Sequence, residues 1–331
     1  MKKRGRGMAC MYYPLGFTSY PNPSGAFVKY NPDGSAVVLT GAQDIGQGSA
    51  TVLAQIAAET LGIPYERVTL LYGDTQAVPM DAGSVASRVT YIAGNAIKKA
   101  CEQARATLLE VAADMMGVLA HGLEVADGWV YLKDFPEKRL PIADVARTAE
   151  VSRGRPCQGE ATYNPATTLL DKETGHGRPY ETFVYAAQVA EVEVDTETGE
   201  VQILKMYAVH DCGKAINPMM VEGQIEGGIA MGVGYALMEK MEFDNGRVIN
   251  PQFANYIVPT ALDVPPIDCG IVEVPEPKGP FGAKGIGEPS LLPTAPAILN
   301  AIYDAIGVRI RDLPATPEKI LAELEKQKNS Q

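Results

Sequence analysis

One stretch near the C-terminal end combines residue types that can do chemistry. The string Gly-Pro-Phe-Gly-Ala-Lys-Gly-Ile-Gly-Glu-Pro occupies residues 279–289 and places the carboxylate of Glu288 directly before Pro289. Dense glycines let backbone amides approach a ligand and take positive φ angles that other residues disfavour. Pro289 should restrict Glu288 to extended backbone conformations and so fix the carboxylate in place. The string therefore predicts either a general base held against a ligand or a mobile surface loop with a solvated glutamate.

A second glycine-rich loop opens a predicted helix. Residues 25–40 read as two strands joined by an Asn-Pro-Asp-Gly turn, and the loop 41–48 follows them directly. Residues 51–61 then keep apolar side chains on one face, which predicts a helix. The loop ends with Gly46, Gln47 and Gly48. Exposed N–H groups at a helix start suit an anion, but a plain strand-to-helix turn explains the same pattern.

A third loop of small residues, 81–88, precedes a long helix predicted over 89–116. Small residues and one arginine at a helix start again suit an anionic ligand, although Ser84 could simply cap the helix. The loop ends with Ala86, Ser87 and Arg88. Gly94 and Asn95 fall early in the helix, where both are poor helix formers, which indicates a close contact at that point.

The second half of the chain contains a helix with an unusual glycine content. Strands predicted over 186–195 and 201–209 form a hairpin, and a helix over about 218–239 follows. Each glycine within a helix costs ~1 kcal/mol relative to alanine. Its glycines are Gly223, Gly227, Gly228, Gly232 and Gly234. Such a helix either packs closely against another backbone or lines a ligand, and Gln224 is its best-placed polar group to face one. Amphipathic helices are predicted over 295–306 and 317–325.

Composition excludes several classes of partner. The 331 residues hold 29 Lys and Arg against 40 Asp and Glu, a formal charge of -11. Nucleic acid and anionic membrane surfaces both attract basic proteins, so neither is an expected partner. The basic start, residues 1–7, resembles the first part of a signal peptide, but the apolar stretch after it is short and broken by Pro14. Because no apolar run reaches membrane-spanning length, we expect a cytoplasmic protein.

Cysteine and histidine usage bears on metal binding. The chain has five scattered cysteines, three histidines, and neither a CxxC nor an HExxH motif. Iron–sulfur clusters, structural zinc and protein-ligated catalytic metals are therefore not indicated. Any redox metal would have to arrive inside an organic cofactor. A large polar cofactor bearing phosphates, held by backbone and amide groups, would account for all the close-approach loops together.

The order of the motifs resembles one known family. G-x-x-x-x-G-Q-G, S-x-A-S-R before a G-N-A helix, D-C-G-x-x-x-N-P, E-G-Q-x-E-G-G and G-A-K-G-x-G-E-P follow one another from about Arg6 to the end. This order resembles the C-terminal molybdopterin-binding half of the xanthine dehydrogenase, or molybdenum hydroxylase, family. The resemblance implies an α+β fold of two α/β sub-domains. We expect them over residues 1–165 and 166–331, the second carrying the Glu288 loop.

The resemblance also implies roles for single residues. Glu288 corresponds to the catalytic base of the family, and the amide of Ala86 would lie close to the molybdenum. The cofactor-binding positions implied are Gly46, Gln47, Gly48, Ala86, Ser87, Arg88, Gly94, Asn95, Gln224, Lys284, Gly285 and Gly287. Tyr12, Tyr13 and Tyr20 either line the substrate pocket or belong to the core. No protein side chain is expected to bind the metal, because the pterin holds it.

The same resemblance implies cofactors and partners. The cofactor would be molybdopterin cytosine dinucleotide with a sulfido or selenido ligand on molybdenum, and FAD and [2Fe-2S] clusters would lie on partner subunits. Family large subunits usually carry a further N-terminal half that completes the pocket. We therefore expect this chain to be one subunit of a split large subunit. Its partners would be a second molybdopterin-binding subunit, an iron–sulfur subunit and an FAD subunit.

The expected reaction is hydroxylation of an N-heteroaromatic substrate with water as the oxygen source. Purine, xanthine and aldehyde substrates are the alternatives within the family. A non-catalytic carrier of the pterin cofactor is the alternative outside catalysis. Such a carrier would need the glycine loops but would have no use for Glu288.

Overall fold

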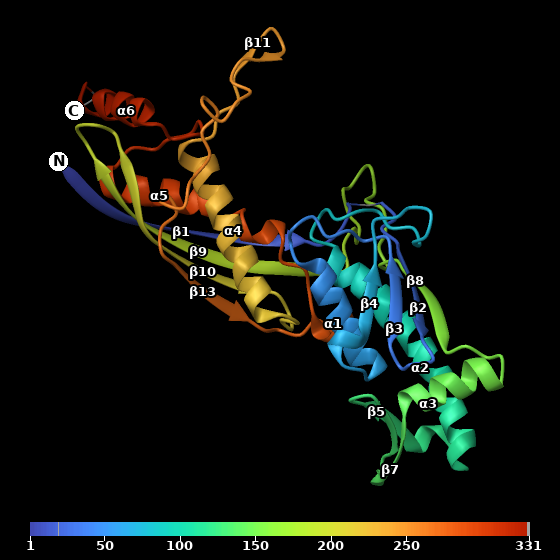
Figure 1. Ribbon diagram of the computed structural model, residues 1–331. Coiled ribbons are helices and arrows are strands. Elements are labelled where there is room, and N and C mark those ends of the chain that lie inside the picture. The colour runs from blue at the N-terminus through green and yellow to red at the C-terminus, as the bar shows by residue number, and fades with distance from the viewer. Residues whose placement is uncertain (19, 330–331) are drawn as a thin grey trace. The chain divides into compact units, whose positions relative to one another are not determined.

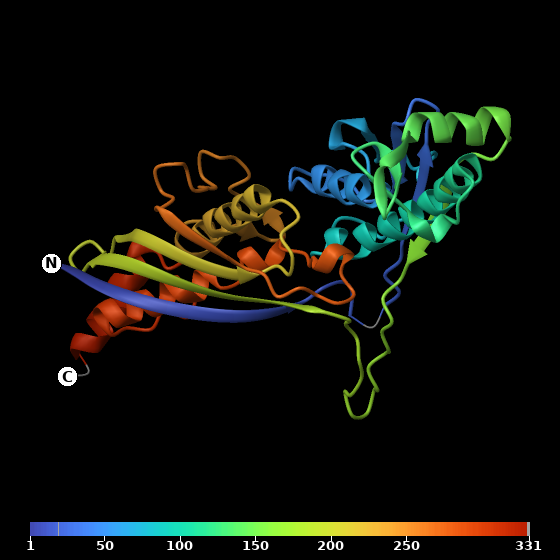
Figure 2. The same cartoon turned by 90° about the horizontal axis from the view of Figure 1, so that it is seen from below.

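The chain folds into two compact units. The computed structural model describes residues 1–18 and 20–329 and is shown in Figure 1 and, from below, in Figure 2. Unit 1 comprises Met1–Tyr13, Phe183–Val274 and Ile286–Gln331, and unit 2 comprises Pro14–Thr182 and Pro275–Gly285. Helices and sheets occur in both units, which confirms the α+β class. The expected sub-domains, 1–165 and 166–331, are continuous segments, whereas each compact unit is built from more than one segment of the chain.

Unit 1 is built on a sheet with strand order β1-β9-β10-β13, whose strands Figure 1 labels. The strands are β1 (Lys2–Pro14), β9 (Phe183–Asp195), β10 (Val201–Asp211) and β13 (Ile267–Val272). β9 and β10 pair antiparallel, as the predicted hairpin requires, and β10 and β13 pair parallel. Alternate side chains of β9, such as Ala190 and Val192, are fully buried. One face of this sheet therefore forms the core of unit 1.

Strand β1 was not expected from the basic start of the chain. Its arginines alternate with glycines, and Arg4 and Arg6 pair with Glu193 and Glu191 of β9 at 3.0 and 2.8 Å. On the opposite face, a Cβ on Gly5 would lie 2.9 Å from the Cα of a helix residue. The N-terminal segment thus belongs to unit 1, held by ion pairs on one face and close packing on the other.

Three helices complete unit 1. They are α4 (Pro218–Leu237), α5 (Thr294–Ile306) and α6 (Pro317–Asn329), and Figure 1 shows α4 running across the strands. Asn217 caps α4 by accepting the N–H of Met220 at 3.2 Å, and Pro218 occupies its first turn. A short hairpin of β11 (Phe243–Asp244) and β12 (Arg247–Val248) follows α4. Apolar residues from β9, β10 and all three helices form one core cluster.

The glycines of α4 fall into two groups. A Cβ on Gly228 would lie 2.6 Å from the Cβ of Ser290, and one on Gly232 would lie 2.6 Å from the Cγ2 of Thr294. Nothing lies within 4 Å of the position that a Cβ would take on Gly223 or Gly227. The first pair allows α4 to touch a neighbouring backbone, and the second pair leaves an open face beside Gln224. Close packing therefore accounts for Gly228 and Gly232, and a ligand beside Gly223 and Gly227 stays a prediction.

Unit 2 contains a second four-stranded sheet with the order β4-β3-β2-β8. Its strands are β2 (Ser24–Tyr30), β3 (Ala36–Thr40), β4 (Val68–Leu71) and β8 (Gln158–Tyr163). Helices α1 (Ser49–Leu61) and α2 (Gly94–Met116) pack against this sheet, and a π-helical turn, Val89–Ala93, precedes α2. The predicted strands around the turn and the predicted helices are confirmed; β8 was not expected.

The remainder of unit 2 is smaller. A three-stranded sheet consists of β5 (Leu123–Ala126), β6 (Trp129–Leu132) and β7 (Phe135–Pro141), and α3 (Ile142–Arg147) follows it. The segment 164–182 has no helix or strand. Short 3-10 helices of unit 2 are Tyr65–Arg67, Ala120–Gly122 and Pro280–Gly282, and Thr148–Ser152 is a second π-helical turn. A further 3-10 helix, Glu288–Ser290, belongs to unit 1. Among the described residues, no helix is long and apolar enough to cross a membrane.

The two groups of glycines give a matched pair of variants. Gly228→Ala should lower the free energy of unfolding by about 1–3 kcal/mol, because the added methyl overlaps Ser290. Gly227→Ala, one residue earlier, should raise it by about 0.5–1 kcal/mol, because the methyl points into open space and alanine favours the helix. Denaturant unfolding of the chain, followed by circular dichroism, checks both. Equal effects of the two substitutions would contradict the packing described for α4.

Candidate functional site

The loop before α1 satisfies its own amides. The carboxylate of Asp44 accepts the N–H groups of Ala50 at 2.9 Å, Gly46 at 2.8 Å and Gly48 at 3.4 Å. Burial opposes ionisation of Asp44, but these three amides outweigh it and lower its pKa. An anion at the start of α1 would therefore have to displace a carboxylate that the chain supplies itself.

Gln47 is folded back onto the same loop. Its Oε1 accepts the N–H of Ile45 at 2.6 Å, and its Nε2 donates to the carbonyl of Gln43 at 3.1 Å and to Ser49 Oγ at 2.8 Å. Gly46 and Gly48 have φ angles of 108° and 80°, which explains the need for glycine at both. A contact between Gln47 and a cofactor stays a prediction, and it would require these hydrogen bonds to be exchanged.

The loop 81–88 is strained and held by Arg88. Ala86 and Ser87 both take left-handed backbone conformations, with φ angles of 54° and 49°. Consecutive non-glycine residues rarely adopt this conformation, and such strain persists only where the surroundings impose it. Here the carbonyl of Ala86 accepts the N–H of Gly16 at 3.0 Å. Ser84, which could have been a helix cap, instead accepts the N–H of Gln43 at 3.2 Å and ties this loop to the one before α1.

The guanidinium of Arg88 is fully buried and uses all its donors. It pairs with Asp81 at 2.6 Å, and its other bonds run to the carbonyl of Gly83 at 3.0 Å and to Asn22 and Pro23 at 2.5–3.3 Å. Arginine has five N–H groups, and five acceptors surround this one. A direct side-chain contact with a cofactor therefore has no donor left. The role that the geometry supports for Arg88 is to hold the Ala86 and Ser87 backbone in place.

Unit 2 brings three of the predicted site segments together. Asn95 Nδ2 donates to the carbonyls of Tyr91 and Lys278, both at 2.8 Å. A Cβ on Gly94 would lie 2.9 Å from Pro280, and one on Gly285 would lie 2.9 Å from the carbonyl carbon of Ser87. The start of α2, the strained loop and the segment 278–285 therefore pack backbone to backbone. Lys284 is buried beside them, 8% exposed.

Glu288 lies in unit 1, at the start of the 3-10 helix Glu288–Ser290. The expectation of an extended Glu288 is therefore wrong: Pro289 sits in the first turn of a helix, where its missing N–H costs nothing. Leu291 N donates to the carbonyl of Glu288 at 3.0 Å, and Ser290 Oγ donates to that of Gly287 at 2.7 Å. Glu288 is half-buried. Its backbone is thus held in a closed turn rather than in a mobile loop.

A buried polar cluster beneath this turn was missed at the sequence level. Gln188 of β9 donates through Nε2 to the carbonyl of Ser290 at 2.8 Å and lies 3.3 Å from His210 Nε2 of β10. Thr294 Oγ1 donates to Gln188 Oε1 at 2.7 Å. The side chains of Gln188, His210 and Thr294 are fully buried. The available signal was a polar residue at an inward position of strand β9, which otherwise alternates small and aliphatic residues.

Burial lowers the pKa of His210 to about 4. Its Nδ1 is buried and has no hydrogen-bond partner among the described residues. The ring is therefore neutral at physiological pH.

The remaining predicted site residues are exposed or half-exposed. Gln224 is half-buried, and its amide makes no hydrogen bond within the described part of the chain. Tyr12 and Tyr20 are 69% and 68% exposed, so neither belongs to the core. Tyr13 is half-buried. The ring of Tyr12 lies 6.0 Å from that of Phe183, in a small aromatic cluster on the unit 1 sheet. A place for these tyrosines in a substrate pocket stays a prediction.

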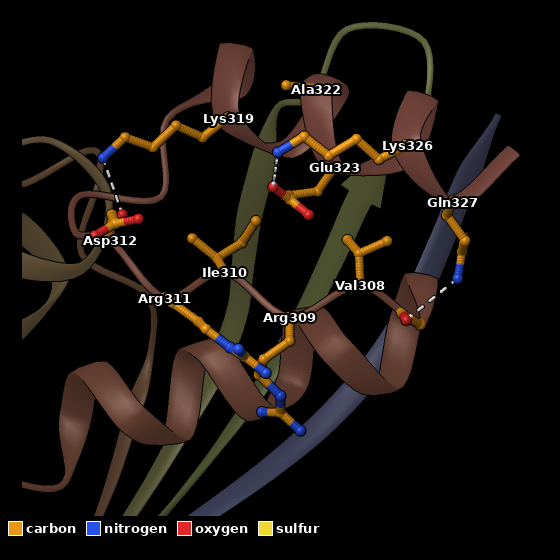
Figure 3. Close-up of a pocket in the computed structure, with 11 residues that line it drawn as sticks. Val308, Arg309, Ile310, Arg311, Asp312, Lys319, Ala322, Glu323, Lys326 and Gln327 are labelled. Carbon is orange, nitrogen blue, oxygen red and sulfur yellow. Dashed lines mark hydrogen bonds and ion pairs between the residues drawn. The ribbon is translucent and has the colours of Figure 1, made fainter. Parts of the chain in front are cut away.

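None of these residues lines the surface pocket of unit 1 that Figure 3 shows. It is lined by the segment 307–312 and by α6, including four basic side chains. Lys319 donates to the carbonyl of Asp312 at 2.9 Å, and Lys326 pairs with Glu323 at 2.7 Å, as Figure 3 shows. These cations do not point to a common centre. Among the described residues, no group of three or more His, Cys, Asp and Glu side chains could hold a metal ion.

The role of Arg88 is testable by stability. Arg88→Met should lower the free energy of unfolding of unit 2 by about 3–5 kcal/mol, because it leaves Asp81 buried without its partner. Arg105→Met removes an ion pair with the half-exposed Glu124 instead and should change it little. Trp129, the single tryptophan, lies in unit 2 and reports its unfolding by fluorescence. Similar losses for both variants would contradict the structural role of Arg88.

The lowered pKa of His210 predicts a pH dependence. Between the ordinary pKa of 6.5 and the folded value of about 4, the unfolded chain binds one more proton at this residue than the folded chain. The free energy of unfolding should therefore fall, as pH drops through this range, by up to about 1.4 kcal/mol per pH unit from this group. His210→Gln should remove that contribution, because the other ionisable groups are the same in both proteins. If the free energy of unfolding of the wild type and of His210→Gln changed equally between pH 6.5 and pH 4, the predicted contribution of His210 would be refuted.

Known proteins resemble this chain over nearly its whole length. A xanthine dehydrogenase molybdenum-binding subunit from Escherichia coli O157:H7 is 36% identical over 330 residues, which cover 97% of this chain and 42% of that protein. The nicotine 6-hydroxylase large subunit from Paenarthrobacter nicotinovorans is 35% identical over 300 residues, covering 89% of this chain and 36% of that protein. The chain thus spans about two fifths of the length of these relatives.

Solved structures resemble the fold. Quinoline 2-oxidoreductase from Pseudomonas putida 86 matches with a TM-score of 0.89 and 31% identity, over 98% of this chain and 42% of that one. This match confirms the fold expected from the motifs. The molybdopterin cofactor-binding domain family matches residues 1–265. This chain, whose motif order already resembled that family, is a member of it.

Proposed function

We propose that this chain is the molybdopterin-binding half-subunit of a molybdenum hydroxylase and that Glu288 is its general base. The observation that carries the proposal is the Glu288 turn. Glu288 is half-buried, and hydrogen bonds at 2.7 and 3.0 Å hold the backbone on both sides of it. A carrier of the cofactor would gain nothing from a glutamate held in this way. The turn therefore favours catalysis over the carrier alternative.

The residues present fit a pterin cofactor. Gln224 offers an amide with open space over the neighbouring Gly223 and Gly227 in unit 1. In unit 2, the strained backbone at Ala86 and Ser87 offers peptide groups in a fixed orientation, beside Gly285. Amide donors and acceptors of this kind suit a pterin, whose ring edge carries both. We propose molybdopterin cytosine dinucleotide, with a sulfido or selenido ligand on molybdenum, as the form bound.

The bound cofactor would supply the centre that takes up two electrons from the substrate. The chain would contribute the proton transfer: Glu288 accepts the proton from the attacking oxygen as the new C–O bond forms. In the net reaction one substrate C–H bond and one water O–H bond break, and two protons and two electrons leave. General bases typically contribute ~10²- to 10⁴-fold in rate.

We propose an N-heteroaromatic substrate, with nicotinate, converted to 6-hydroxynicotinate, as the specific candidate. The names of two similar proteins, nicotine 6-hydroxylase and quinoline 2-oxidoreductase, number the ring carbon next to nitrogen. That carbon is electron-poor and open to nucleophilic attack. Xanthine and other purines remain the alternative, since a xanthine dehydrogenase subunit is as similar in sequence. Aldehydes are the third alternative, because an aldehyde oxidoreductase subunit of Escherichia coli O157:H7 is 34% identical.

The exposed face of α4 supports a partner for this chain. Met219, Met231 and Tyr235 are 73%, 63% and 60% exposed. These three residues and the open Gly223 and Gly227 form a series with steps of four residues. This spacing places all five on one face of the helix. An exposed apolar face of this kind marks an interaction surface. We propose that a second molybdopterin-binding subunit covers it, and that separate iron–sulfur and FAD subunits, carrying [2Fe-2S] clusters and FAD, complete the enzyme.

The base is tested by one substitution in the chain purified with its natural partners. Glu288→Gln should lower turnover per molybdenum by at least about 10²-fold, because the amide cannot accept the proton. The molybdenum content should not change. Glu325→Gln, at an exposed position of α6, is the control and should leave both unchanged. Full turnover of Glu288→Gln would remove Glu288 as the base.

Elemental analysis of the same wild-type preparation tests the cofactor. Molybdenum at one atom per chain supports the proposal, and selenium at the same level distinguishes a selenido from a sulfido ligand. A preparation that contains neither molybdenum nor selenium would overturn the assignment of this chain to a molybdenum hydroxylase.

A further inference from the structure

We propose that Gln188 is a positioning residue for Glu288, and that His210 and Thr294 fix its side chain for this task. The inference rests on the proposed function, because it concerns the same carboxylate. It adds residues of β9, β10 and α5 that none of the glycine motifs contains. The argument starts from the hydrogen bonds of one buried amide.

The orientation of the Gln188 amide follows from its neighbours. The carbonyl of Ser290 can only accept a hydrogen bond, so the group that faces it at 2.8 Å must be the NH₂ of Gln188. The Oε1 then faces Thr294 Oγ1, which donates to it at 2.7 Å. The second N–H of the amide is directed to His210 Nε2 at 3.3 Å. A flipped amide would set two acceptors against each other at Ser290.

This arrangement requires His210 to be neutral, with its proton on Nδ1. Only an unprotonated Nε2 can accept from Gln188. The burial of the ring, which lowers its pKa to about 4, favours the same state. Nδ1 is buried and has no hydrogen-bond partner among the described residues. His210 therefore serves as an acceptor that completes the Gln188 amide, rather than as an acid or base.

The amide holds the turn from beneath. Ser290 is the last residue of the 3-10 helix that begins with Glu288, and Gln188 fixes its carbonyl. The hydroxyl of Ser290 fixes the carbonyl of Gly287 at 2.7 Å on the other side of the carboxylate. Helix α4 closes the remaining side, since a Cβ on Gly228 would overlap Ser290. The backbone direction of Glu288 is therefore set by contacts that all meet at Ser290.

Packing of the core alone does not require polar side chains at positions 188 and 210. Gln188 and His210 face inward from strands whose neighbouring inward residues, Ala186, Ala190 and Ala208, are apolar. Apolar side chains of similar shape would fill the same space, and their burial would not require any hydrogen-bond partners. The polar set instead provides one directional bond to the turn that carries the proposed base.

The test measures the turn and the reaction separately. Gln188→Met keeps the length of the side chain and removes its hydrogen bonds. In the full chain, amide hydrogen exchange of the segment 287–291 should accelerate at least about 10-fold, while exchange in β10 away from residue 210 stays unchanged. In the complete enzyme, kcat per molybdenum should fall about 10-fold or more, with KM and molybdenum content unchanged. Gln202→Met, at an exposed position of β10, is the control and should alter none of these.

His210 provides a rescue experiment. His210→Leu removes the acceptor and should reproduce the faster exchange of 287–291 and the lower kcat. His210→Gln can place an amide oxygen near the Nε2 position and should restore both to within about threefold of the wild type. Failure of His210→Gln to differ from His210→Leu would overturn the acceptor role.

Two outcomes would overturn the role of Gln188. One is wild-type exchange and kcat in Gln188→Met. The other is a fall in activity that only follows a fall in molybdenum content, which would make Gln188 a purely structural residue. If Glu288→Gln were fully active, the proposed base would fail, but the exchange of Gln188→Met would still decide whether Gln188 holds the turn.

Discussion

Unit 1 depends on the close approach of a helix to a turn. Helix α4 carries glycines at the two positions where it meets Ser290 and Thr294, and any side chain there would push the helix away. Each glycine weakens the helix by ~1 kcal/mol, and the packing of α4 against the core of unit 1 offsets this cost. The contact fixes Gln224 on α4 relative to the Glu288 turn. The amide and the carboxylate therefore stand on one rigid framework.

In the glycine-rich loops of unit 2, the polar side chains of Asp44 and Arg88 are already used in hydrogen bonds within the unit. The carboxylate of Asp44 accepts the amides at the start of α1, and the side chain of Arg88 donates to Asp81 and Gly83 of its own loop and to Asn22 and Pro23. What the loops leave for a ligand is oriented backbone, at Ala86 and Ser87 above all. The chain has a formal net charge of -11, so it offers little electrostatic attraction to an anionic cofactor. Oriented backbone groups instead allow recognition through the pattern of hydrogen bonds.

Much of this fold and part of the site were accessible from the sequence. The turn at Asn31–Gly34, the cap and proline at the start of α4 and the hairpin of β9 and β10 have local signals, and the structure contains all three. The close contact inferred at Gly94 and Asn95 also exists, although it is with the chain itself. The partners of the Arg88 side chain could not be predicted, because only tertiary structure reveals that five acceptors surround it. Gln188 was readable as a polar residue in an aliphatic alternation, but its partners lie 22 and 106 residues away.

The place of β1 has a consequence for the order of folding. The first strand of the chain pairs with β9, and the amino group of Met1 lies 3.3 Å from Asp195, 194 residues later. Nearly all of unit 2 is synthesised between these two partners. During synthesis from the N-terminus, the basic and glycine-rich strand must wait, unpaired, until β9 emerges from the ribosome. Closing so long a loop is slow, and it is easier once unit 2 has folded and shortened the distance that the chain must span.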